Sequence, residues 1–193
     1  FVPSTINKQN KEIILGYIGS IDTAYNIENI ILAFSKIIDE MPNLRLKVYS
    51  KNHLKFNFLI KKYNISSEYC SIDYVNRNNI VDVINSFDYG IFYINNNYSS
   101  KASFPTKIAE LLLCGKPIIC NHFNDDISNM IVDNNLGIIN EFNNYDHNKL
   151  IKFIKEKYKD NKKSYHCHQF AKEKLSLNYG CDIYNKIYEK ISI

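Results

Sequence analysis

The segment SFPTKIAELLLCGKPIICN, Ser103–Asn121, decides the fold. Apolar residues recur at helical spacing over Pro105–Cys114, which predicts a short helix. The Gly-Lys-Pro sequence at 115–117 ends that helix, because neither Gly nor Pro favours its continuation. The apolar run at 117–120 then predicts a buried strand. A short helix that leads directly into a buried strand is typical of an α/β protein with a parallel sheet.

The same alternation extends through the chain in both directions. Strands are predicted at 12–19, 44–50, 69–75, 89–94, 117–120 and 136–139. Helices are predicted at 27–41, 52–63, 79–87, 105–114, 126–134, 148–158, 163–174 and 180–191. Strands that alternate with helices pair in parallel through right-handed crossovers. We therefore predict an α/β fold, a Rossmann-like doubly wound parallel sheet of about six strands with helices on both faces.

The composition limits the class of protein. The chain has 193 residues, of which 45% are hydrophobic and 23% charged, as in a globular protein with a buried core. No apolar run is long enough for a membrane-spanning helix. The net charge of +4 is spread along the chain, which argues against nucleic acid as a partner. Because the chain opens with FVPS and has no Met start, we expect a fragment or an excised domain.

The cysteines and histidines do not predict a metal site. Cys70, Cys114 and Cys120 lie in apolar runs and are expected to be reduced thiols of the core. The segment His166–His168 reads His-Cys-His and is the only cluster that resembles a metal site. Successive residues of a helix point in different directions, so we expect a polar helix surface there and no metal.

Ligands of an open parallel sheet bind beyond the carboxyl ends of the strands. Gly19 and Ser20 follow the first strand, and Val75 follows the third. A glycine lets a ligand approach the backbone, and a serine offers a hydroxyl and an N–H, although a lone glycine here is also consistent with an ordinary turn. No GxGxxG or P-loop sequence is present, which disfavours a Rossmann dehydrogenase and a kinase-type NTPase.

The helix at 105–114 begins with features of a phosphate site. Pro105 suits a first helical turn, and Ser103 is the predicted N-cap. The amide N–H groups of Thr106 and Lys107 would then point out of the helix, where such groups bind phosphate. The positive charge of Lys107 has the wrong sign for a helix N-terminus, which makes sense if an anion binds there.

Glu110 follows Lys107 by three residues and lies on a nearby face of the helix. A carboxylate one turn behind a phosphate site can accept hydrogen bonds from the two hydroxyls of a ribose. A surface Lys–Glu pair at this spacing, which stabilises a helix by a few tenths of a kcal/mol, is an equally consistent reading.

Three segments resemble a known family. The sequence PTKIAELLLCGKPIICN at 105–121 resembles the P-T-K-x-x-E-x-L-x-x-G-x-P-V-I signature in the C-terminal half of GT-B glycosyltransferases of group 1, a family 4-like class. The sequence YIGSIDTAYNIENIILAF at 17–34 is similar to the Y-x-G-S-x-G-T-W-Y opening of a bacterial subgroup. The tail LSLNYGCDIYNKIYEKI at 175–191 resembles the closing segment of that family, so the resemblance covers nearly the whole chain.

The resemblance implies that this half binds a nucleoside-diphosphate sugar, the donor. The donor-binding residues carried over are Gly19, Ser20, Val75, Ser103, Pro105, Thr106, Lys107 and Glu110. Glu110 would hold the ribose and Val75 would lie near the base. No metal cofactor is expected, because Lys and helix N–H groups would meet the charge of the diphosphate.

The chain departs from the family pattern at several positions. Ala102 stands where retaining relatives carry the first Glu of an E-x7-E pair. Asp22 and Ala24 replace the Gly and Trp of the subgroup, and Asp126 matches a family Gly-Asp whose Gly is Asp125 here. Catalytic residues are therefore not assigned, and the sequence does not specify the sugar, the base, the acceptor, the stereochemical outcome or the oligomeric state.

The resemblance also implies a domain organisation. Residues 1–174 would form the nucleotide-sugar-binding domain, and 175–193 a C-terminal helix that packs on an N-terminal acceptor domain missing from this chain. Donor and acceptor meet between the two halves in GT-B enzymes, so we expect this chain alone to bind donor but not to transfer sugar.

The expected function is sugar transfer to a glycan or lipid-linked acceptor in bacterial surface polysaccharide synthesis, such as that of lipopolysaccharide. The expected location is cytoplasmic, at most peripheral on the inner face of the membrane. Two alternatives stay open. One is a non-catalytic nucleotide-binding or partner-docking module, which Ala102 favours, and the other is half of a GT-B-like sugar-nucleotide epimerase.

Overall fold

The computed structural model describes residues 1–3, 12–21, 24–141, 146–157 and 161–191. Asp22, which departs from the subgroup pattern, lies outside these ranges. Within them, six parallel strands form one sheet in the order β3-β2-β1-β4-β5-β6. The strands are β1 (Ile13–Ile18), β2 (Leu44–Tyr49), β3 (Cys70–Asp73), β4 (Tyr89–Phe92), β5 (Ile118–Cys120) and β6 (Gly137–Ile139). The predicted Rossmann-like parallel sheet is confirmed, in the order of a doubly wound fold.

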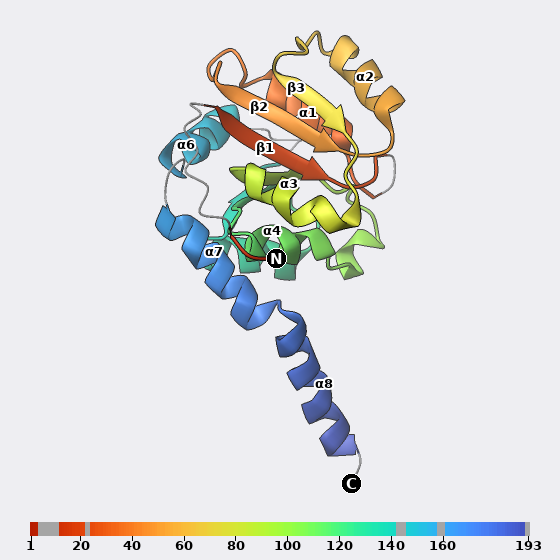
Figure 1. Ribbon diagram of the computed structural model, residues 1–193, viewed down its shortest axis with the longest axis vertical. Helices are drawn as coiled ribbons and strands as arrows, with labels where there is room; N and C mark the ends of the chain where they lie inside the picture. Colours follow the sequence, from red (N-terminus) through yellow and green to blue (C-terminus); the bar gives the residue numbers. More distant parts are fainter. Residues whose placement is uncertain (4–11, 22–23, 142–145, 158–160, 192–193) are drawn as a thin grey trace.

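Helices connect the strands and cover both faces of the sheet. They are α1 (Ile27–Ser35), α2 (His53–Lys62), α3 (Ile80–Ser86), α4 (Thr106–Leu113), α5 (Asp125–Asp133), α6 (His147–Lys157), α7 (Asn161–Lys174) and α8 (Leu177–Ile191), with short 3-10 turns η1 (Arg77–Asn79) and η2 (Ser100–Ala102). In Figure 1, α1 lies behind the sheet and α3 in front of it. The helix α7 packs against α4, and α8 extends away from the sheet (Figure 1).

The largest differences from the predicted helix boundaries occur in α1 and α8. The helix expected at 27–41 ends at Ser35 and continues as turns, yet Ile37 and Met41 remain buried. The spacing of apolar residues therefore predicted correctly that Ile37 and Met41 are buried, but it did not predict where the helix ends. The last helix begins at Leu177 rather than at Gly180.

The positions of the cysteines confirm one prediction and show that another was wrong. Cys70, Cys114 and Cys120 are buried and free, as expected. Cys167 is also fully buried, so the expectation of a polar helix surface at 166–168 was wrong for this residue. The flanking His166 and His168 bond to the backbone carbonyls of different segments. No group of residues suited to a metal occurs in the described part of the chain.

Two glycines face each other at the centre of the sheet, where β1 pairs with β4. Gly16 and Gly90 are partners in register, and both leave room for a helix-side residue. A Cβ on Gly16 would lie 2.0 Å from the ring of Phe87, and one on Gly90 would lie 2.4 Å from Leu111. Phe87, at the end of α3, and Leu111, in α4, therefore rest directly on the strand backbones, and the contact of Leu111 with Gly90 places α4 close to the sheet.

The side chain of Asn121 prolongs the pairing of β4 with β5. Its Oδ1 accepts a hydrogen bond from the N–H of Ile94 at 2.7 Å, and its Nδ2 donates to the carbonyl of Ile94 at 2.9 Å. The same Nδ2 donates to the carbonyl of His122 at 2.9 Å. This fully buried amide thus fixes the point at which the chain leaves β4.

The glycine pair predicts a stability effect. The substitution Gly16→Ala should lower the free energy of unfolding by about 1–3 kcal/mol, because its methyl group would overlap the buried ring of Phe87. Gly180→Ala is the matched control, since an added Cβ there has nothing within 4 Å. Chemical denaturation measures both, and an unchanged midpoint for Gly16→Ala would contradict the close seating of Phe87.

Candidate functional site

The strand order reverses between β1 and β4, and this reversal creates a crevice at their carboxyl ends, where ligands of such sheets bind. Gly19 follows β1, and α4 begins beyond β4. Both segments were predicted to contribute to a ligand site. They meet at the side chain of Lys107, in the first turn of α4.

The ammonium group of Lys107 lies in a cage of three aromatic rings. Its Nζ is 3.3 Å from the ring centroid of Tyr25, 4.4 Å from that of Tyr17 and 5.8 Å from that of Phe92. The nitrogen is covered from solvent, although the residue as a whole is half-buried, and it has no hydrogen-bond partner among the described residues. Cation–π contacts replace part of its lost hydration.

Gly19 leaves space for this ammonium group. The φ angle of Gly19 is +145°, which side chains rarely adopt, and a Cβ there would lie 2.8 Å from Lys107 Nζ. The positive φ favours glycine after β1, and a larger residue there would also displace the Lys107 ammonium from its present position. Tyr17 supports the same loop by donating its hydroxyl to the carbonyl of Ser20 at 2.5 Å.

Burial lowers the pKa of Lys107 to about 7, and the nearby carboxylate of Glu110 opposes this shift. Burial also raises the pKa of Tyr25, and the charge of Glu110 adds to that effect. Lys107, Tyr25 and Glu110 thus form one electrostatic group. A bound anion would favour the charged form of Lys107, so anion binding and protonation are linked.

Tyr25 reaches the cage because the loop after β1 pairs with the segment after β4. Tyr25 and Ile94 form an antiparallel bridge, and the N–H of Asn26 donates to the carbonyl of Tyr93 at 2.8 Å. The N–H of Asn95 donates to the carbonyl of Ala24, also at 2.8 Å. Sequence analysis did not select Tyr17 or Tyr25, because no local pattern marks a contact that depends on this pairing.

The start of α4 differs from the prediction in one respect. The N-cap is Pro105, not Ser103, and no side chain caps the helix. Ser103 instead donates its hydroxyl to the carbonyl of Ser100 at 2.9 Å. The N–H groups of Thr106 and Lys107 therefore have no side-chain cap, which is the condition for anion binding at a helix N-terminus.

A cavity of about 360 Å³ extends from the crevice along the ends of β1, β2 and β3. Gly19, Ser20 and Val75 all line it, so three of the predicted residues lie together. Ser50 also lines it, and its buried hydroxyl has no hydrogen-bond partner among the described residues. The sequence placed Ser50 at a strand end but gave no reason to select it.

The predicted site residues thus fall into two adjoining groups. Gly19, Lys107 and Glu110 interact at the crevice, and Gly19, Ser20 and Val75 line the adjacent cavity. Thr106 is exposed at the start of α4 and Pro105 is buried below it. Ser103 is exposed and its hydroxyl donates to Ser100, away from the helix.

None of the helices in the described ranges has the length and apolarity needed to span a membrane.

The sequence matches the family model of glycosyl transferases group 1 over residues 3–174. No curated protein matches it. Among solved structures, the C-terminal domain of a group 1 glycosyl transferase family protein (LpcC) from Francisella tularensis superposes with a TM-score of 0.69 at 15% identity. That match covers 92% of this chain and 96% of the LpcC domain.

Two longer proteins contain the same fold. Sucrose-phosphate synthase from Thermosynechococcus elongatus matches with a TM-score of 0.74 at 15% identity, over 99% of this chain and 49% of that one. WaaG, a glycosyltransferase involved in lipopolysaccharide biosynthesis, matches with a TM-score of 0.64 at 15% identity, over 83% and 43%. This chain therefore spans less than half of either protein. At such identity these likenesses establish the fold, that of a GT-B C-terminal domain, as predicted.

The Lys107 cage predicts a pH dependence of stability. The pKa of Lys107 is near 7 in the folded chain and 10.5 ordinarily, so above pH 7 the unfolded state binds more protons. Stability should therefore rise with pH above 7, with a slope of at most about 1.4 kcal/mol per pH unit. Lys107→Met should remove this rise and should be the more stable protein at pH 6.

Urea unfolding between pH 6 and 9 tests this, with the exposed Lys172→Met as control. Differences from the parent chain are compared, because titration of the buried thiols affects all variants equally. A Lys107→Met curve parallel to the parent curve would show that Lys107 is not buried as an unpaired cation.

Proposed function

The chain belongs to the group 1 glycosyl transferases, and from this premise we propose that it is the donor-binding half of an enzyme that transfers sugar from a nucleoside-diphosphate sugar. The observation that carries the proposal is the buried, unpartnered ammonium of Lys107 beside Gly19 at the start of α4. An unpaired buried cation is costly, and a diphosphate placed there would offset that cost.

The diphosphate would bind between the loop after β1 and the start of α4. The N–H groups of Thr106 and Lys107 would donate to its oxygens, and the ammonium of Lys107 would turn from its aromatic cage toward it. As the bond from the sugar to the diphosphate breaks, negative charge builds on the leaving diphosphate. Lys107 and the helix N–H groups would stabilise that charge without a metal ion.

The nucleoside would occupy the cavity along the ends of β1, β2 and β3. Glu110 would accept hydrogen bonds from the ribose hydroxyls, and the base would enter between Val75 and Ser50. The unpartnered hydroxyl of Ser50 supplies a polar contact for a base edge. Two similar structures support nucleotide binding in this fold, since one was crystallised with UDP and GlcNAc and another with UDP-glucose.

The proposed role is synthesis of bacterial surface polysaccharide, on a glycan or lipid-linked acceptor, in the cytoplasm or at the inner face of the membrane. The similarity to WaaG supports this role. The acceptor would bind to an N-terminal domain, on which the exposed apolar residues of α8, including Tyr184, Ile187 and Tyr188, would pack. Sugar transfer by this chain alone would contradict that arrangement.

A non-catalytic nucleotide-binding module is the second candidate. Ala102 favours it, because the carboxylate that retaining relatives carry is absent at this position. Both candidates predict nucleotide binding. Only the first predicts transfer by a longer protein that contains this chain together with an acceptor domain.

Ligand-dependent stability tests donor binding. Thermal unfolding of the chain would be measured with UDP, GDP and CMP and with their sugar conjugates. The matching nucleotide at 100 times its dissociation constant should add about 2.7 kcal/mol to the free energy of unfolding. EDTA should not change this effect. If no nucleotide stabilises the chain, the donor-site assignment is wrong.

The ribose contact predicts a binding defect. Glu110→Gln should raise the dissociation constant of the stabilising nucleotide by roughly tenfold to a hundredfold, because a hydrogen bond to a charged group contributes about 1.5–3 kcal/mol. Titration calorimetry measures this effect. Glu173→Gln, an exposed residue on α7, is the control and should bind like the parent chain. Equal affinities for both variants would remove Glu110 from the site.

A further inference from the structure

The helix α2 exposes two large apolar side chains that no described segment of the chain covers. Leu54 is 85% exposed and Phe58 is 62% exposed. The two residues are four apart, so they lie on the same face of the helix. The opposite face carries Phe56 and Leu59, which are buried in the core. The core therefore accounts for the inner face of α2, and the outer face requires a separate explanation.

The charges around this apolar pair are almost all positive. The segment 51–67, which contains α2, has no Asp or Glu, although the whole chain has 20 acidic and 24 basic residues. Its four lysines are Lys51, Lys55, Lys61 and Lys62. Lys61 follows Phe58 by three residues and so continues the outer face. Glu28 of α1 pairs with Lys62 at 2.5 Å and offsets one of the four charges. We call Leu54, Phe58 and the four lysines the basic α2 face.

One end of the basic α2 face reaches the mouth of the larger cavity. Tyr74, which follows β3, is exposed, and Lys51 Nζ lies 5.4 Å from the centroid of its ring. Both residues line the cavity at the ends of β1, β2 and β3. Tyrosine has an apolar ring and a polar tip, which suits the boundary between water and lipid. A surface that contacted α2 would thus lie beside the proposed nucleoside site.

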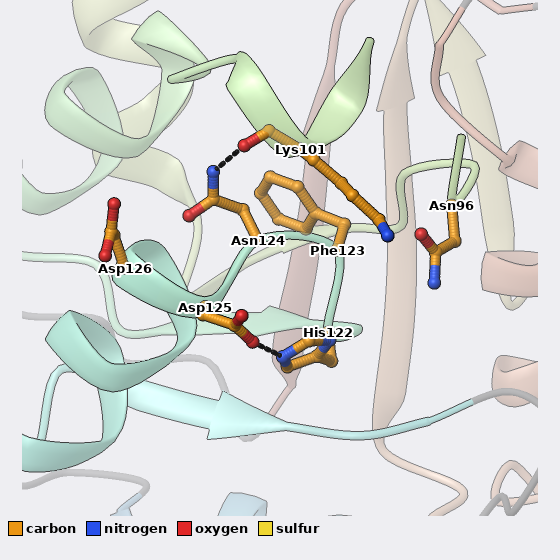
Figure 2. Close-up of a pocket in the computed structure, with 7 residues that line it drawn as sticks. All are labelled: Asn96, Lys101, His122, Phe123, Asn124, Asp125 and Asp126. Carbon is orange, nitrogen blue, oxygen red and sulfur yellow. Dashed lines mark hydrogen bonds and ion pairs between the residues drawn. The ribbon is translucent and has the colours of Figure 1, made fainter. Parts of the chain in front are cut away.

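Two other surfaces do not combine exposed apolar residues with an excess of positive charge. The helix α8 exposes apolar residues, but its two lysines are balanced by two acidic residues, and it lies at the other end of the molecule from α2 (Figure 1). The cavity at the carboxyl ends of β4 and β5 contains Lys101 and His122, but also Asp125 and Asp126 (Figure 2). These carboxylates would oppose contact with an anionic surface.

We propose that the basic α2 face binds the surface of a bilayer that contains anionic lipids. Leu54 and Phe58 enter the boundary between headgroups and acyl chains, and the lysines lie against the lipid phosphates. Two apolar side chains and a few charges give weak, reversible binding, so the contact is peripheral. It orients the chain with the mouth of the larger cavity close to the membrane.

Other occupants fit this face less well. A symmetric contact with a second copy of the chain would bring the same lysines of both copies together, and like charges in an interface are costly. A nucleic acid would pair with the lysines, but it would leave the aliphatic side chain of Leu54 without a suitable partner. A bilayer satisfies both the charges and the apolar pair.

The inference deepens the proposed function and rests on it for the choice of acceptor. A membrane beside the crevice favours a lipid-linked acceptor over a free glycan. The contact itself requires no nucleotide, so membrane binding and donor binding can fail separately.

Vesicle sedimentation tests the contact, with the 193-residue chain and no nucleotide present. Vesicles of phosphatidylcholine alone are compared with vesicles that also contain about one-third phosphatidylglycerol, which supplies the anionic charge. The variants are Phe58→Ser and Lys61→Glu, with Tyr165→Ser and Lys172→Glu on α7 as exposed matched controls. Because α8 also exposes apolar residues, each variant is compared with the parent chain.

The parent chain should bind the anionic vesicles on the order of tenfold more tightly than the neutral ones, and added salt should weaken this binding. Phe58→Ser and Lys61→Glu should each reduce the binding on the order of tenfold, because each removes a contact with the bilayer. The controls should bind like the parent chain.

Four results would overturn the proposal. The first is no preference for anionic vesicles, and the second is an equal loss of binding in the α2 variants and their controls. The third is a loss with Lys61→Glu alone, together with equal binding to a DNA duplex, which would indicate attraction to any polyanion. The fourth is no vesicle binding but a dimer in sedimentation equilibrium that Phe58→Ser abolishes, which would assign the face to self-association. Vesicle binding by a chain that binds no nucleotide would leave this inference intact and contradict the donor-site proposal.

Discussion

The pairing of Gly16 with Gly90 at the centre of the sheet is the constraint on which the site depends. Because neither strand has a side chain there, Phe87 and Leu111 contact the backbone itself. The helix α4 therefore lies close to β4, and its first turn reaches the carboxyl edge of the sheet. A bulkier pair at these positions would move α4 outward and separate Lys107 from Gly19.

Two opposing effects act on the charged form of Lys107 in its aromatic cage. Burial disfavours the ammonium ion, and the rings of Tyr17 and Tyr25 recover only part of its hydration. The ammonium group is nevertheless buried in the crevice, beside the N–H groups of α4 that no side chain caps. An anion that bound at those N–H groups would have this ammonium close by, and the Lys107 side chain would have to turn out of its cage to reach it.

The fold could be predicted from sequence because its signals are local. Continuous apolar runs marked β1, β4 and β5, which are buried on both faces, and alternation of apolar and polar residues marked β2, which is buried on one face. The sequence did not place the N-cap of α4 correctly, because it predicted Ser103 and the structure has Pro105. Phe104 precedes a proline and is thereby disfavoured from helical geometry, and Pro105 itself has an extended ψ of 120°, so the helix begins at Thr106. Ser103 is then too far from the helix to cap it.

Most residues of the candidate site were also selected from the sequence, and those that were not selected share a reason. Gly19, Lys107 and Glu110 belong to motifs of contiguous or helically spaced residues. Tyr25 meets Lys107 only because the loop after β1 bridges to Ile94, and the burial of Ser50 depends on its neighbouring strands. These contacts join segments that are far apart in the sequence, so the spacing of residues within one segment does not predict them.

The buried amide of Asn121 has a consequence for how proteins of this fold diversify. It fixes Ile94, where the chain leaves β4, while the buried Pro105 is the N-cap at which the chain enters α4. Between these two anchors, the exposed residues 96–99 and 101–104 can change without disturbing the sheet, because insertions in anchored surface loops cost little free energy. These exposed positions are therefore a place where recognition can change while the architecture stays constant.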